Sequence, residues 1–166
     1  MGNGFAPKCK KCGYEFHALY GVGLLFPYEY RKQMEAGRRG ELGEKVQRFL
    51  KEHPDGVLDI ERTAMQCTKC GEYASNMKLN MYLPVEGKII EKDQSVRWSI
   101  AAPAEDVEYV DPDDLPRYYR LAGRYTHICE HCGGRMRYVS QKIQRKELTC
   151  PHCKAIMDTY NFLFWD

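Results

Sequence analysis

The sequence of 166 residues predicts an α+β fold that is rich in β-strands and held together by bound metal. Three observations lead to this expectation. All eight cysteines occur in C-x-x-C pairs, several short runs alternate apolar and polar side chains, and one segment between the first two pairs has apolar residues at helical spacing. Alternation with period two is typical of half-buried strands, whereas a spacing of three and four residues is typical of helices.

The four C-x-x-C pairs are the strongest motif in the chain. Thiolates three positions apart can bind one ion from a single tight turn, and a second turn of this kind completes a tetrahedron. Four pairs therefore predict two four-cysteine sites. The candidate metal ligands are Cys9, Cys12, Cys67, Cys70, Cys129, Cys132, Cys150 and Cys153.

Eight cysteines could instead form disulfides in a secreted domain, but three features of the sequence argue against this. The first 12 residues contain no apolar core of a signal peptide. Every cysteine belongs to a C-x-x-C pair, and the chain is long for a disulfide-stapled scaffold. No apolar run approaches the roughly 20 residues of a membrane span. We therefore expect reduced, metal-bound cysteines in a cytoplasmic protein that does not enter a membrane.

A glycine directly follows the second cysteine in three of the pairs, at Gly13, Gly71 and Gly133, whereas Lys154 holds this position in the fourth. Glycine allows the positive φ that such a tight turn requires. This C-x-x-C-G pattern resembles the zinc knuckles of zinc-ribbon and rubredoxin-like domains. The resemblance covers the local motifs only. It implies that each knuckle joins two strands and that two knuckles close over one ion.

Two structural zinc ions in two zinc-ribbon-like units follow from the resemblance. We expect the pairs to combine sequentially, because the spacing between Cys132 and Cys150 is short, with a cross-braced arrangement as the alternative. Iron is the alternative metal, although rubredoxin usually repeats a proline in its second knuckle and only Pro151 matches here. The expected ligand sets are Cys9, Cys12, Cys67 and Cys70 for one ion, and Cys129, Cys132, Cys150 and Cys153 for the other.

A helical insertion over about residues 28–53 is predicted inside the first unit. Pro27 can open a helix over residues 28–36 that ends at Gly37. A second helix is expected from Gly40 to His53, because Val46 and Leu50 share a face with the neighbouring apolar residues. Acidic residues interrupt the basic ones between positions 31 and 48, so we interpret this segment as a solvated helix surface.

Strands are predicted on both sides of the second pair. Residues 57–66 lead into Cys67, residues 75–83 alternate strictly from Met77 to Leu83, and a further alternating run surrounds Trp98. Residues 103–116 form an acidic, proline-containing connector, followed by a short helix that Asp114 could cap. We therefore expect an N-terminal domain at 1–102, a linker at 103–123 and a C-terminal zinc ribbon at 124–166.

The C-terminal ribbon should consist of strands at residues 124–128, 134–139, 146–149 and 154–160. His131 and His152 lie inside their turns, where side chains point away from the ion, so neither is expected to be a ligand. A four-cysteine centre has no open position for water. Because the chain also has no Ser–His–Asp, H-E-x-x-H or P-loop pattern, we expect no catalytic residues, no enzymatic activity and no small-molecule substrate.

The segment 135–146 is the best candidate for binding nucleic acid, because basic side chains can meet phosphates and a tyrosine can stack on a base. The alternative is a solvated hairpin beside an anionic metal centre. A protein-interaction or assembly role is the alternative function, through the insertion helices or the aromatic segment 162–165, which could also pack as a last strand. The candidate nucleic-acid contacts are Arg135, Arg137, Tyr138, Lys142, Arg145 and Lys146.

Overall fold

The computed structural model describes residues 2–23, 25–88, 109–139 and 148–165. The chain divides into two units. Unit 1 comprises Met1–Gly23, Arg62–Met77 and Thr126–Asp166, and unit 2 comprises Leu24–Glu61 and Lys78–Tyr125. This interleaved division differs from the expected boundaries after residues 102 and 123, because strands far apart in the sequence pair with each other. The helices and strands of the described residues are consistent with the α+β, strand-rich class.

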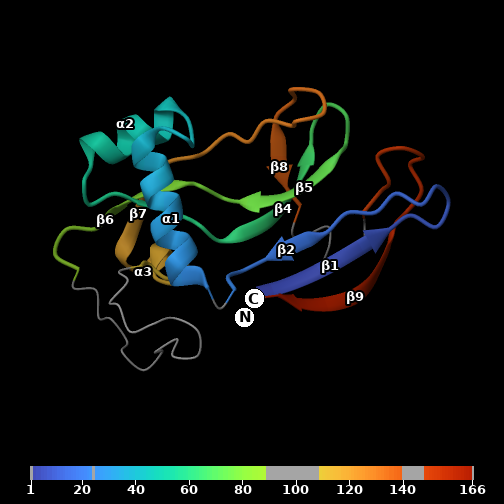
Figure 1. The fold of residues 1–166 in the computed structure, drawn as a ribbon, viewed down its shortest axis with the longest axis horizontal. Helices are drawn as coiled ribbons and strands as arrows, with labels where there is room; N and C mark the ends of the chain where they lie inside the picture. Colours follow the sequence, from blue (N-terminus) through green and yellow to red (C-terminus); the bar gives the residue numbers. More distant parts are fainter. Residues whose placement is uncertain (1, 24, 89–108, 140–147, 166) are drawn as a thin grey trace. The chain divides into compact units, whose positions relative to one another are not determined.

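Unit 1 contains two three-stranded antiparallel sheets (Figure 1). The first has the order β2-β1-β9, and the second has the order β5-β4-β8. The bounds are β1 Gly2–Lys8, β2 Ala18–Tyr20, β4 Arg62–Cys67, β5 Tyr73–Met77, β8 Met136–Tyr138 and β9 Asp158–Trp165.

The first sheet joins the two ends of the chain. Strand β9 pairs with β1 from Asp158, opposite Lys8, to Trp165, opposite Gly2. The expectation that the aromatic segment 162–165 forms a last strand is therefore confirmed. Strand β2 pairs with the other side of β1, where Phe5 lies opposite Ala18.

The second sheet combines the second and third cysteine pairs. Gln66 lies opposite Tyr73 on β5 and opposite Arg137 on β8, and Cys67 lies opposite Met136. The segment that leaves the third pair is thus a strand, as predicted for residues 134–139, but it extends the sheet of the second pair. One buried core includes Ala18 of β2 and Ala64 of β4 together with Leu148 and Met157. The cysteine turns consequently project from one common scaffold.

Unit 2 contains a sheet of order β3-β6-β7 together with the helices of the insertion (Figure 1). The strands are β3 Val57–Leu58, β6 Met81–Pro84 and β7 Tyr119–Gly123. The helices are α1 Phe26–Arg39, α2 Glu44–Glu52 and α3 Leu115–Tyr118. No helix among the described residues is both long and apolar enough to span a bilayer.

The predicted end of the first helix at Gly37 is wrong, because α1 continues to Arg39 and ends at Gly40, which is left-handed with a φ of 85°. Gly37 instead lies at the contact between helices. A Cβ at this position would approach Leu50 Cδ1 to 2.8 Å and Val46 Cγ1 to 3.1 Å. The missing side chain therefore lets α1 and α2 pack closely.

The single strand predicted over residues 75–83 is also wrong. Leu79 has a left-handed φ of 56° and separates β5, in unit 1, from β6, in unit 2. Its N–H donates to the carbonyl of Asp59 at 2.7 Å, which holds this bend. Because apolar residues keep period two through the bend, alternation alone could not reveal it.

Three other expected elements differ in detail. Residues 57–66 form two strands, β3 and β4, rather than one. The strand expected at 124–128 does not form: β7 ends at Gly123, and only Ile128 makes a bridge, with Arg135. The short helix after Asp114 is confirmed as α3, but the Asp114 side chain makes no capping hydrogen bond. The run around Trp98, most of the acidic connector and residues 142–146 lie outside the described residues.

Candidate metal centres

The eight cysteines form two groups of four, and all Sγ atoms of a group lie within 4.8 Å of one another. Site A consists of Cys9, Cys12, Cys150 and Cys153, and site B consists of Cys67, Cys70, Cys129 and Cys132. The first pair thus combines with the fourth, and the second with the third. This nested arrangement corrects the expected sequential ligand sets and also differs from the cross-braced alternative.

Strand pairing explains the nested arrangement. Strand β1 leads into the first pair and is the partner of β9, which follows the fourth pair. Strand β4 leads into the second pair and is the partner of β8, which follows the third. Each sheet therefore places two cysteine turns next to each other at one metal site. At site A, these turns bring together Cys12 and Cys150, which are 138 positions apart in the sequence.

All four cysteine turns share one backbone conformation. The N–H of the first cysteine donates to the carbonyl five residues later, and the N–H four residues later donates back to the carbonyl of that cysteine, at 2.8–3.1 Å. The residue that donates back is left-handed in each turn. These residues are Gly13, Gly71, Gly133 and Lys154, with φ between 61° and 85°. The local prediction of four equivalent knuckles is confirmed.

The spacing of the sulfur atoms fits a tetrahedral metal ion. The Sγ–Sγ distance is 3.4 Å for Cys9–Cys153 and for Cys12–Cys150 at site A. It is 3.5 Å for Cys67–Cys132 and 3.7 Å for Cys70–Cys129 at site B. Four metal–sulfur bonds of about 2.3 Å in a tetrahedron place the sulfurs about 3.8 Å apart. Both groups can therefore hold an ion, and no cysteine forms a disulfide.

Backbone N–H groups prepare the first thiol of two knuckles for metal binding. At Cys67, the N–H groups of Cys70 and Lys69 outweigh the effect of burial and lower the thiol pKa to about 6. At Cys9, burial raises the pKa, but N–H groups of Cys12 and Lys11 and the thiol of Cys153 lower it to about 7. A thiol of lower pKa gives up its proton more readily to a metal ion.

Gly134 contributes to site B without offering a ligand. A Cβ at this position would lie 2.9 Å from Cys67 Sγ, 3.3 Å from Cys132 Sγ and 2.8 Å from Lys69 Cβ. Our sequence interpretation missed this residue. The two consecutive glycines after Cys132 could have indicated it. Gly133 provides the left-handed turn, so Gly134 requires a separate explanation.

The two histidines inside the turns are outside the four-sulfur groups, as expected. His131 is exposed. His152 directs Nε2 to Glu72 Oε1, at a distance of 2.9 Å. The imidazole of His152 therefore contacts a residue of the other site rather than the ion of its own.

The structure places part of the expected nucleic-acid surface beside site B. Arg135 and Arg137 are exposed, and the carbonyl of Arg135 accepts hydrogen bonds from the N–H and the hydroxyl of Thr68, both at 2.9 Å. Side chains alternate along β8, so Tyr138 lies on the face opposite to Arg137. Tyr138 and Arg137 therefore cannot contact the same nucleic-acid strand from one face of β8. Lys142, Arg145 and Lys146 lie outside the described residues.

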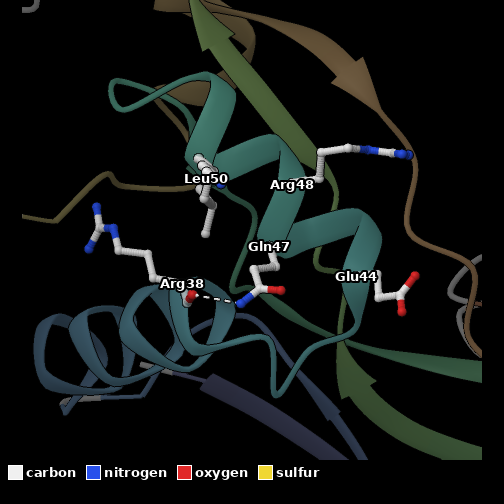
Figure 2. A pocket seen from close by; sticks show the side chains of 6 residues that line it. Arg38, Glu44, Gln47, Arg48 and Leu50 are labelled. Atoms are coloured by element: carbon white, nitrogen blue, oxygen red, sulfur yellow. Dashed lines mark hydrogen bonds between the residues drawn. The ribbon is translucent and has the colours of Figure 1, made fainter.

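Unit 2 has a surface hollow beside α2, shown in Figure 2. Its Arg38 and Arg48 side chains extend in different directions, and Gln47 Nε2 donates to the carbonyl of Arg38 at 3.3 Å (Figure 2). The polar groups do not converge on a common point, so this hollow resembles an ordinary helix surface. The lining residues are Arg38, Glu44, Gln47, Arg48, Leu50 and Lys51.

Comparison of the chain with models of known protein families, with curated proteins and with solved structures gives no match.

Proposed function

We propose that the chain is a non-catalytic zinc protein in which two zinc-ribbon-like units share one scaffold. The observation that supports this most strongly is the pair of four-sulfur groups with tetrahedral spacing. Four-cysteine zinc sites are closed and structural, because no position is left for water or substrate. Thiolates in a metal site of this kind need a reducing compartment, so we expect a cytoplasmic protein.

Elemental analysis with native mass spectrometry tests the metal. We expect two zinc ions per chain after purification under reducing conditions. Removal of two ligands of one site, by Cys129→Ser with Cys132→Ser, should reduce the content to one. Two iron atoms per chain, with the visible absorption of iron–thiolate centres, would establish the rubredoxin-like alternative, and a chain without metal would refute the proposal.

We further propose that unit 1 binds the phosphate backbone of nucleic acid beside site B. Lys69, Arg135 and Arg137 are exposed there, and no carboxylate of the described residues lies within ion-pair distance of any of them. Two lysines near the first knuckle are instead paired with carboxylates. Lys8 Nζ lies 3.2 Å from Glu15 Oε2, and Lys10 Nζ lies 2.6 Å from Asp158 Oδ2.

Lys69 lies in the second knuckle, next to the segment that carries Arg135 and Arg137. A Cβ on Gly134, next to Arg135, would lie 2.8 Å from Lys69 Cβ, and Arg137 follows Arg135 on the same strand face. Unpaired cations close together can neutralise adjacent phosphates, and the release of counterions then stabilises the complex. Backbone binding of this kind is insensitive to base sequence.

Fluorescence anisotropy with labelled single-stranded RNA and DNA tests this surface at several salt concentrations. Arg135→Ala with Arg137→Ala should weaken binding at low salt by at least about tenfold. It should also reduce the slope of log K against log salt by about 1.4, because two phosphate contacts are lost. The control is Lys51→Ala with Arg117→Ala, which removes two exposed charges from unit 2. Equal effects of the two double variants would refute a binding surface at site B.

A protein-interaction role is the second candidate, with zinc purely structural. It is favoured by Leu25 and Tyr28 at the start of α1, which are 48% and 55% exposed although both are largely apolar. The aromatic C-terminal segment supports this role less, because the backbone of β9 already pairs with β1. Loss of a partner on substitution of Leu25 and Tyr28 by serine, with the zinc content unchanged, would support this candidate.

A further inference from the structure

Residues 71–73 follow Cys70 at the end of the chain's second knuckle, which belongs to site B. They contact both knuckles of site A. Glu72 accepts a hydrogen bond from the hydroxyl of Tyr14 at 2.9 Å, and its other oxygen lies 2.9 Å from His152 Nε2. Tyr14 directly follows the first knuckle, and His152 lies inside the fourth. One carboxylate of site B therefore joins the two halves of site A.

The neighbours of Glu72, which are Gly71 and Tyr73, add further contacts. Tyr73 donates its hydroxyl hydrogen to the carbonyl of Thr149 at 3.0 Å, immediately before the fourth knuckle, and its ring stacks on Phe16 at 4.6 Å between centroids. A Cβ at Gly71 would lie 3.6 Å from Pro151 Cβ, which is ordinary van der Waals contact. Three consecutive residues thus pack against site A.

The conformation of residues 71–73 depends on the second knuckle. The N–H of Gly71 donates to the carbonyl of Cys67 at 3.1 Å, and the N–H of Cys67 donates to the carbonyl of Glu72 at 2.8 Å. The Gln66 side chain donates to the carbonyl of Gly71 at 3.2 Å. A metal ion that closes site B therefore holds the segment in the conformation that contacts site A.

We propose that the two sites bind metal cooperatively, because residues 71–73 of site B hold the first and fourth knuckles together for site A. Without this support, only the pairing of β1 with β9 holds together turns that are 138 positions apart, and the ion at site A must bear more of the entropy cost of ordering them. This inference rests on the proposed function, in that both sites must hold metal. Coupling is reciprocal, so an ion at site A favours binding at site B by the same factor, typically about 5–150-fold.

Native mass spectrometry of the metal-free chain, titrated with Co²⁺ as a spectroscopic probe under reducing conditions, tests the coupling. With one equivalent of Co²⁺, the wild-type chain should contain mainly metal-free and two-ion species. Glu72→Ala should increase the one-ion species and reduce the coupling factor by about 5–150-fold. Glu130→Ala is the matched control, because Glu130 lies in the third knuckle of site B and is exposed.

The outcomes separate the coupling from the metal sites themselves. A chain that binds no Co²⁺ would refute the proposed function. A wild-type chain that binds two ions with a statistical share of the one-ion species would refute the coupling alone, as would equal behaviour of Glu72→Ala and Glu130→Ala. Tyr73→Phe removes only the hydroxyl that binds Thr149, so it provides the same comparison if Glu72→Ala fails to fold. It should increase the one-ion species less than Glu72→Ala does.

Discussion

Gly134 lies against the sulfur of Cys67, so closely that a Cβ on residue 134 would be 2.9 Å from that Sγ. This contact leaves no room for a side chain beside site B. The third knuckle can therefore close over the second only because residue 134 is glycine.

Gly134→Ala should weaken metal binding at site B, since the added methyl group must displace Cys67 or Cys132 from tetrahedral positions. We expect an affinity loss of at least about tenfold, measured by Co²⁺ titration against a chelator, corresponding to about 1.4 kcal/mol. Gly133→Ala is the comparison, because a Cβ there meets nothing within 4 Å and only the left-handed backbone is strained. An equal loss of affinity in both variants would show that crowding at the sulfur is unimportant.

Lys154→Gly should stabilise the fold. Lys154 occupies the left-handed position that glycine holds in the other three knuckles, with a φ of 61°. A side chain in this conformation costs about 1 kcal/mol relative to glycine. The lysine recovers part of this cost, because Nζ donates to the carbonyl of Pro151 at 2.7 Å. We therefore expect a gain of about 0.5–1 kcal/mol in the free energy of unfolding, measured by chemical denaturation of the metal-loaded chain.

Lys154→Ala is the control for this substitution. It keeps the backbone strain and removes the hydrogen bond of the lysine, so it should be neutral or destabilising. If alanine stabilises the chain as much as glycine does, the strain at residue 154 is not the cause.

Gly37→Ala should destabilise unit 2 by about 1–3 kcal/mol, although alanine is the better helix former. The added methyl would lie 2.8 Å from Leu50 Cδ1 and 3.1 Å from Val46 Cγ1, so these buried side chains, or the helices that carry them, must shift. The loss of helical circular dichroism on heating measures this effect. Combination with Leu50→Val should restore part of the stability, whereas Glu35→Ala, on the exposed face, should change it by less than about 0.5 kcal/mol.

Asp59→Asn should change how stability depends on pH. Burial, opposed by the nearby Lys78, raises the pKa of Asp59 to about 6 in the folded chain, compared with 3.8 for a free side chain. The folded state therefore keeps this proton to higher pH than the unfolded state does, and the contribution of Asp59 to stability falls as the pH rises from about 4 to about 6.

The measurement is the difference in unfolding free energy between Asp59→Asn and the wild-type chain across this pH range. The variant should gain on the wild type as the pH rises, by up to about 2–3 kcal/mol, since one pKa unit corresponds to about 1.4 kcal/mol. The attraction of Lys78, whose Nζ lies 3.7 Å from Asp59 Oδ2, is already contained in this pKa. Asp55→Asn, which removes an exposed carboxyl group four residues earlier, is the matched control. A pH-independent difference for Asp59→Asn would contradict the assignment.

The knuckles illustrate what is readable from the chain alone. The hydrogen bonds of each turn join residues four or five positions apart, so C-x-x-C-G contains nearly all the information that the turn requires. The existence of α1 was likewise readable from Pro27, and that of α2 from apolar spacing. Their ends were less so, because Gly37 stops no helix when a neighbouring helix covers it.

The bend at Leu79 shows where local patterns fail. The residues on both sides alternate as in one strand, yet β5 and β6 belong to different sheets. The carbonyl of Asp59 stabilises the bend, and this acceptor lies 20 positions earlier in the chain. The alternating pattern of residues 75–83 therefore does not predict the bend.

The sequence by itself determined that eight thiols form four equivalent turns able to bind two ions. Only the tertiary structure decided which turns share an ion. The short spacing of the third and fourth pairs favoured a sequential arrangement, but β8 pairs with β4 and β9 pairs with β1. The physical reason is that the geometry of a turn depends on neighbouring residues, whereas the choice of its partner depends on strand pairing and burial summed over the whole unit.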